Sequence, residues 1–149
     1  MMTKIVAKYI DRGLGFPVVL EHVPMVQVRG KWTPSINYTQ LALAVLRQLA
    51  ERSGRLTGQQ VRFVRQHFAM TLQAFAARFG VTHVAVLKWE QRGNKPTGMT
   101  WSTEKDLRLF IHQQVSGQAE EFVHLYDQLS QGRSTRPARI ALPAEKVAA

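Results

Sequence analysis

Residues 70–93 read MTLQAFAARFGVTHVAVLKWEQRG, and this stretch decides how the chain folds. Ala76 lies four residues before Gly80. Two short helices joined by a tight turn need this arrangement, because a small residue lets the helices approach and glycine adopts a positive φ at little cost. The spacing predicts helices over 72–79 and 82–91. The apolar residues expected in their shared core are Phe75, Phe79, Val81, Val86 and Trp89.

Further helices are expected on both sides of this pair. Thr57 and Gln60 have the capping-box spacing, which predicts a helix running to about Phe68. Apolar residues at helical spacing predict the other helices. These are a helix over 38–51 after an N-cap at Asn37, one capped by Ser102 and ending before Ser116–Gly117, and one over about 118–129.

The two ends of the chain have a different character. Residues 3–32 are rich in Val, Ile, Tyr and Phe and contain Gly and Pro, which predicts short strands interrupted at Pro17 and Pro24. Residues 131–149 lack aromatic residues and periodicity, which predicts a flexible tail. The expected fold class is mainly α with a small N-terminal β region. The expected segments are 1–53 (hairpin or sheet plus helix), 54–100 (helix-turn-helix), 101–130 (C-terminal helices) and 131–149 (tail).

The charge is concentrated in the middle of the chain. The protein has 149 residues and a formal net charge of +10, and residues 54–100 carry seven basic side chains and one acidic one. A localised basic surface favours a polyanionic partner, most simply nucleic acid, with an anionic membrane surface as the alternative. No apolar run approaches the ~20 residues that cross a bilayer, so a cytoplasmic protein without a membrane partner is expected.

The sequence contains no pattern typical of an enzyme. The absence of cysteine excludes disulfides, thiol nucleophiles and cysteine-ligated metals. The five histidines lack metal-binding spacing, and there is no phosphate-binding loop, dinucleotide fingerprint or Gly-x-Ser-x-Gly motif. We therefore expect no catalytic residue, metal or cofactor.

Residues 54–97 resemble the Xre/Cro-type, or lambda-repressor-like, DNA-binding domain. The resemblance rests on GQQVRFVRQHFAMTLQAFAARFG and on VLKWEQRGNKP, and the Leu56–Arg65 lead-in is similar to antitoxins of the MqsA and HigA type. The chain departs from this pattern in two ways. MqsA-like proteins carry an N-terminal zinc module, which a chain without cysteine cannot form, and Leu72 stands where the family commonly has Gln.

The resemblance implies that 82–91 is a recognition helix lying in the major groove. The residues implied to read bases are His83, Val84, Leu87 and Lys88, and those implied to bind phosphates are Thr82, Gln73, Arg62, Arg92, Asn94 and Lys95. Arg62 and Arg65 could each clamp the DNA backbone or pair with Glu90. For Glu90, an internal pair with an arginine is favoured.

These features predict a sequence-specific, double-stranded DNA-binding transcription regulator, a repressor that binds its operator as a homodimer. Dimerisation through 103–115 and 118–129 is favoured over pairing of sheet edges. The resemblance leaves open an antitoxin role with a toxin protein as partner. The alternative function is a protein- or RNA-binding adaptor that uses the basic surface without reading a DNA sequence.

Overall fold

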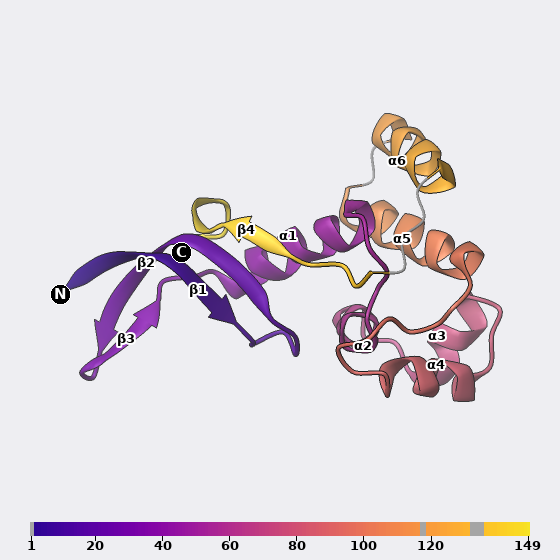
Figure 1. The fold of residues 1–149 in the computed structure, drawn as a ribbon, viewed down its shortest axis with the longest axis horizontal. Coiled ribbons are helices and arrows are strands. Elements are labelled where there is room, and N and C mark those ends of the chain that lie inside the picture. Colours follow the sequence, from indigo (N-terminus) through magenta and orange to yellow (C-terminus); the bar gives the residue numbers. More distant parts are fainter. Residues whose placement is uncertain (1, 117–118, 132–135) are drawn as a thin grey trace. The chain divides into compact units, whose positions relative to one another are not determined.

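The computed structural model describes residues 2–116, 119–131 and 136–149 (Figure 1). The chain divides into two compact units, one formed by residues up to Val45 together with Ile140–Ala149 and the other by Leu46–Arg139. Helix α1 (Tyr38–Glu51) contributes to both. Within the described ranges, no helix has both the length and the apolar character needed to cross a bilayer.

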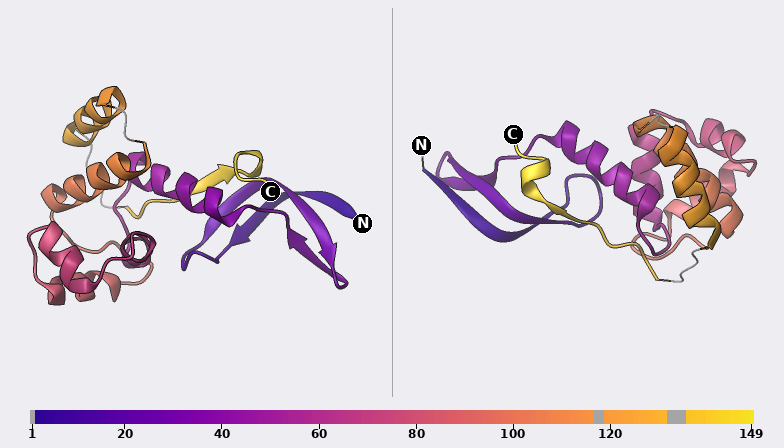
Figure 2. Two further views of the ribbon diagram at one scale, coloured as in Figure 1. Left: turned by 180° about the vertical axis from the view of Figure 1, so that it is seen from behind. Right: turned by 90° about the horizontal axis from the view of Figure 1, so that it is seen from above.

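The first unit is built on a four-stranded mixed sheet (Figures 1 and 2). Strands β1 (Thr3–Asp11) and β2 (Val18–Val28) form a long antiparallel hairpin, and β3 (Lys31–Pro34) pairs antiparallel with the other side of β2. Near its start, β2 also pairs in parallel with β4 (Ala141–Pro143), which is followed by the 3₁₀ turn η1 (Ala144–Lys146). Strands account for 23% of the described residues and helices for 49%. The expectation of a mainly α fold with only a small β region was therefore wrong.

Pro24 explains part of this error, because the sequence predicted an interruption there. Its carbonyl accepts a hydrogen bond from the Ser35 N–H (2.8 Å) on the β3 side. The N–H and C=O of one residue in an antiparallel ladder point to the same side, so the missing N–H of proline also faces that side. There it lies beyond the last β3 pair, Met25 with Pro34. Strand β2 therefore continues through Pro24 without losing a bond to β1.

The C-terminal segment is the second reason why the sequence underestimated the sheet. A flexible tail was predicted for 131–149, of which 132–135 lie outside the described residues. Residues 141–143 instead form β4, and Ile140, Leu142 and Val147 are buried. Because β4 pairs with a strand more than 110 positions earlier, short-range periodicity does not reveal it.

The β1–β2 turn is fixed by a buried carboxylate. Asp11 accepts hydrogen bonds from the Gly13 N–H (2.9 Å) and the Tyr38 hydroxyl (2.7 Å). The bond to Asp11, with some burial, raises the pKa of Tyr38 to about 12. At the β2–β3 turn, Arg29 and Gly30 both have positive φ, as a two-residue hairpin turn of type I′ requires.

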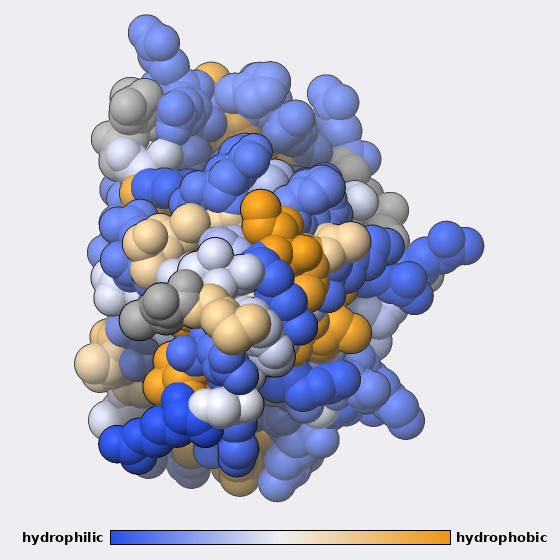
Figure 3. Space-filling model, turned by 90° about the vertical axis from the view of Figure 1, so that its left-hand side faces the viewer, coloured by the Kyte–Doolittle hydropathy of each residue, from blue (hydrophilic) through white to orange (hydrophobic). Residues whose placement is uncertain are grey.

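Strand β1 lies at one edge of the sheet. The apolar side chains exposed in this unit include Met2, Ile5, Ile10 and Val28. Figure 3 shows apolar side chains set among hydrophilic ones on the face that lies to the left in Figure 1. No other strand of the described chain pairs with the outer edge of β1. Lys4 and Lys8 lie on this strand, and charged residues at a sheet edge disfavour association with another edge.

The second unit is helical. Its elements after α1 are α2 (Gly58–His67), α3 (Leu72–Arg78), α4 (His83–Glu90), α5 (Trp101–Val115) and α6 (Ala119–Gln131). The predicted capping box of Thr57 and Gln60 is confirmed, as is the cap at Asn37, and Thr71 caps α3. Helix α5 is capped by Thr100 and not by Ser102. The predicted break at Gly117 and the first residue of the last helix, Gln118, lie outside the described residues.

Candidate nucleic-acid interface

Helices α3 and α4 are the two short helices that the sequence predicted on either side of Gly80. Each begins with a threonine cap, Thr71 accepting from the Ala74 N–H (3.0 Å) and Thr82 from the Ala85 N–H (3.1 Å). Between the helices, Gly80 has a φ of 67°, the positive value that the sequence predicted. The turn closes through the Val81 N–H, which donates to the Ala76 carbonyl (3.0 Å).

The predicted shared core of these helices is largely present. Phe75, Ala76, Phe79 and Val86 are buried, while Val81 and Trp89 are half-buried. The Phe75 and Phe79 rings lie 4.8 Å apart, and Phe79 also packs edge-on against Phe110 of α5 (5.5 Å). Aromatic packing of this kind stabilises the orientation of the two helices.

Helix α4 has one buried side and one exposed side. His83, Val84, Leu87 and Lys88 are all exposed, Val84 and Leu87 by 47% and 41%. At about 100° per residue these four side chains occupy one arc of about 140°, opposite buried Val86. All four base-reading candidates therefore share the solvent-facing side of the helix.

The six candidate phosphate-binding residues are exposed as well, and they lie on α2, on α3 and at the two ends of α4. These are Arg62 on α2, Gln73 on α3, Thr82 at the α4 cap, and Arg92, Asn94 and Lys95 in the loop after α4. This loop is held in place, since the Arg92 Nε donates to the Pro96 carbonyl (3.2 Å) and the Gly93 and Lys95 carbonyls accept from α2 N–H groups. The loop thus presents its cations from a fixed backbone.

An ion pair joins the end of α4 to α2. The Arg65 guanidinium binds both oxygens of Glu90, with Nε–Oε2 at 2.7 Å and a second bond of 2.9 Å, and also donates to the Met70 carbonyl. The hydrogen bond to Glu90 raises the pKa of Arg65. The internal pairing expected for Glu90 is confirmed, with Arg65 as its partner and Arg62 left in solvent.

Sequence reasoning missed a buried charge network in the same unit. Glu104 and Arg108 are fully buried on α5, and Glu104 binds both Arg108 and Arg55 at 2.8 Å. Arg108 also donates to the carbonyls of Leu49, Arg52 and Gly54. Burial lowers the pKa of Arg108, and Glu104 opposes that shift. The network fastens the loop between α1 and α2 to α5, and the available signal was that both charges lie on the apolar stripe with Leu107 and Ile111.

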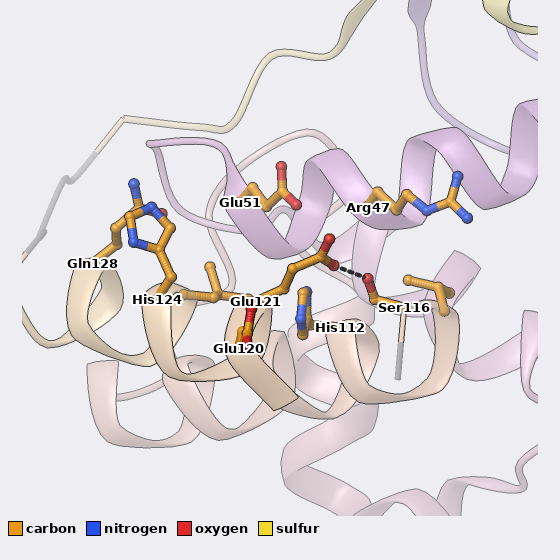
Figure 4. A pocket seen from close by; sticks show the side chains of 10 residues that line it. Arg47, Glu51, His112, Ser116, Glu120, Glu121, His124 and Gln128 are labelled. Atoms are coloured by element: carbon orange, nitrogen blue, oxygen red, sulfur yellow. Dashed lines mark hydrogen bonds between the residues drawn. The ribbon is translucent and has the colours of Figure 1, made fainter. Parts of the chain in front are cut away.

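A cavity of about 760 Å³ lies between the C-terminal part of α1 and helices α5 and α6. Figure 4 shows carboxylate, imidazole and guanidinium groups around it, and the Ser116 hydroxyl donates to Glu121 (2.6 Å). Because charges of both signs line this cavity, it is a poor match to a polyanion. Across the described ranges, no three histidine, aspartate or glutamate side chains converge on a point that a metal ion would occupy.

Comparison of the chain with protein-family models, curated proteins and solved structures gives no match. The resemblance to the Xre/Cro-type domain therefore stays a prediction that rests on the residues quoted above.

Proposed function

We propose that this protein is a sequence-specific DNA-binding transcription regulator, a repressor that reads the major groove with α4. The observation that carries the proposal is the exposed arc of α4. Three of its four side chains, His83, Val84 and Lys88, have groups that contact base edges: a ring nitrogen, a methyl pair for the thymine methyl, and an ammonium for guanine. The helix is also backed by a buried core that fixes its direction.

The charge around α4 supports the same proposal. Arg92 and Lys95 follow the helix and Arg62 lies on α2, all exposed, while the one acidic residue of 54–100, Glu90, is bound to Arg65. The exposed side chains next to the reading face are therefore cationic or neutral. Such an arrangement favours contacts to phosphates, which position a protein on a duplex before base contacts specify the sequence.

We further propose that the protein binds as a homodimer, because a single short helix reads too few base pairs for useful specificity. The C-terminal helices are the favoured surface, since α6 exposes Val123 (59%) and Tyr126 (45%). The outer edge of β1 is the weaker candidate because it carries Lys4 and Lys8. Autoregulation as an antitoxin is a narrower form of this proposal, and it adds a toxin as the protein partner.

The test is selection of bound sequences from a random duplex pool, followed by affinity measurements on the recovered site. We expect a pseudo-palindrome with half-sites about one helical turn apart. His83→Ala and Lys88→Ala should relax the preference at particular positions by about 1–3 kcal/mol each. Lys31→Ala, which removes an exposed lysine from β3, is the matched control and should leave the preference unchanged.

Arg92→Ala separates phosphate contacts from base contacts. It should weaken binding equally on all sequences and lower the slope of log K against log salt by about one. Binding without any recovered motif would refute the proposal. It would favour the alternative hypothesis of an adaptor, with RNA or an acidic protein as the partner. An unchanged preference in both α4 variants would refute the assignment of α4 as the reading helix.

A further inference from the structure

A second cationic site lies away from α4, where the loop after α1 meets the segment before β4. The cavity there has a volume of about 470 Å³, within the range of small-molecule pockets. Its lining residues are Arg52, Ser53, Gly54, Arg136, Pro137 and Arg139. Three arginines therefore line it, and none of the described lining residues is acidic.

The backbone on one wall of this cavity is fixed. The Arg55 N–H donates to the Arg136 carbonyl (2.5 Å) and the Ala138 N–H donates to the Arg55 carbonyl (2.9 Å). The side-chain amide of Gln60 donates to the Ala138 carbonyl (3.1 Å), and Ala138 is buried. Arg136 and Arg139 thus extend from a segment that is tied to α2 and its lead-in.

The opposite wall of the cavity is held in place by the buried Arg108. Arg108 donates to the carbonyls of Arg52 (2.6 Å) and Gly54, which holds the loop that carries Arg52 against α5. Gly54 has a φ of 98°, and a Cβ on it would lie 2.8 Å from backbone atoms of Pro137 and Ala138. The two walls therefore approach as closely as glycine permits, which brings arginines more than 80 positions apart in sequence to one cavity.

We propose that this cavity is a phosphate-binding site for a ligand with more than one phosphate charge. One guanidinium group can bind two phosphate oxygens at once, and it stays charged. Three such groups match the charge of a pyrophosphate-like ligand better than that of a single carboxylate. The phosphates come either from a free phosphorylated molecule or from the nucleic-acid backbone. The site does not depend on the role of α4, because none of its residues lies on that helix or in the loop that follows it.

The test is calorimetric titration of the full chain with inorganic pyrophosphate at low salt. Arg52→Gln and Arg139→Gln are measured singly, and Arg12→Gln is the matched control because it removes an exposed arginine from the β1–β2 turn. We expect saturable binding by the wild type, a dissociation constant raised about tenfold in each cavity variant, and no change in the control. Circular dichroism establishes that each variant is folded.

A second titration, with a random-sequence duplex already bound, identifies the source of the phosphates. Loss of pyrophosphate binding, together with weaker duplex binding by Arg139→Gln, assigns the site to the nucleic-acid backbone. Unchanged pyrophosphate binding assigns it to a free phosphorylated ligand. The proposal is overturned if the wild type shows no saturable binding, or if Arg52→Gln and Arg139→Gln behave like the wild type or like Arg12→Gln. None of these results depends on whether α4 reads an operator.

Discussion

Gly58 is the first residue of α2 and lies against the end of α4. A Cβ at this position would be 2.4 Å from the Trp89 carbonyl oxygen, and 2.8 Å from both the Glu90 oxygen and the Gly93 nitrogen. All three are backbone atoms, so no rotation of a side chain relieves the contact. Gly58→Ala therefore tests whether α2 and α4 are packed as closely as the structure shows.

Two effects of opposite sign decide the result. Alanine is favoured over glycine within a helix by about 1 kcal/mol, which stabilises the variant. Against this, a carbon–oxygen contact of normal length is about 3.3 Å or more, so α2 and α4 must separate by about 1 Å. That movement strains the bonds from the Gly58 N–H to the Lys95 carbonyl (3.2 Å) and from the Gln59 N–H to the Gly93 carbonyl (2.9 Å). Each such bond contributes about 1 kcal/mol, and overpacking adds about 1–3 kcal/mol. The balance is a destabilisation of about 2–4 kcal/mol.

The assay is urea unfolding followed by tryptophan fluorescence, to which Trp89 contributes directly, and by circular dichroism. Gln59→Ala is the control, because it raises helix propensity at the next position and leaves the backbone bond of Gln59 in place. We expect the control to lie within about 0.5 kcal/mol of the wild type and Gly58→Ala to unfold at clearly lower urea. Since the same displacement moves α4, duplex binding by Gly58→Ala should also weaken. A Gly58→Ala variant as stable as the wild type would show that α2 and α4 do not make this close contact.

Three further predictions concern side-chain interactions that stabilise the two units. Tyr38→Phe should reduce the dependence of stability on pH between about 10 and 12: the raised pKa of Tyr38 adds stability that is complete below pH 10 and is lost as pH rises to about 12, as urea titrations across that range would show. Leu142→Ala should destabilise the sheet unit by about 2–4 kcal/mol in thermal or urea unfolding, because the side chain is 3% exposed, and an unchanged midpoint would contradict a packed β4. Glu90→Gln should cost about 3 kcal/mol, because it leaves Arg65 partly buried without its counter-charge, and unfolding at neutral pH measures it.

The two helices on either side of Gly80 were predictable because their determinants are local. A cap and the N–H that donates to it lie three residues apart, as for Thr57 with Gln60 and Thr82 with Ala85, and the positive φ of Gly80 is a property of the turn alone. Short-range rules therefore located these helices to within a residue or two. The prediction of Ser102 as the cap of α5 failed for a related reason: serine and threonine both cap helices well, and only the path of the incoming chain makes Thr100 the cap.

The size of the sheet was not predictable from the same rules. Pro24 interrupts a strand by rule, and it is tolerated here because its missing N–H faces away from β1, beyond the last pair with β3. The distribution of partners along β2 decides this, and no single segment contains that information. Likewise β4 has three residues, too few for a periodic pattern, and it is stabilised by burial of Leu142 and by parallel pairing with β2.

The buried pair of Glu104 and Arg108 shows how non-local contacts also shape the candidate phosphate site. Glutamate and arginine four residues apart on a helix usually form a solvated pair of small energetic value. Here both are fully buried, and such a pair is tolerated only when its remaining hydrogen-bonding groups are satisfied. Arg108 meets this condition through the carbonyls at the end of α1 and in the loop that follows. The same bonds fix the position of Arg52, so the geometry of an exposed cationic cavity depends on a cation that no solvent reaches.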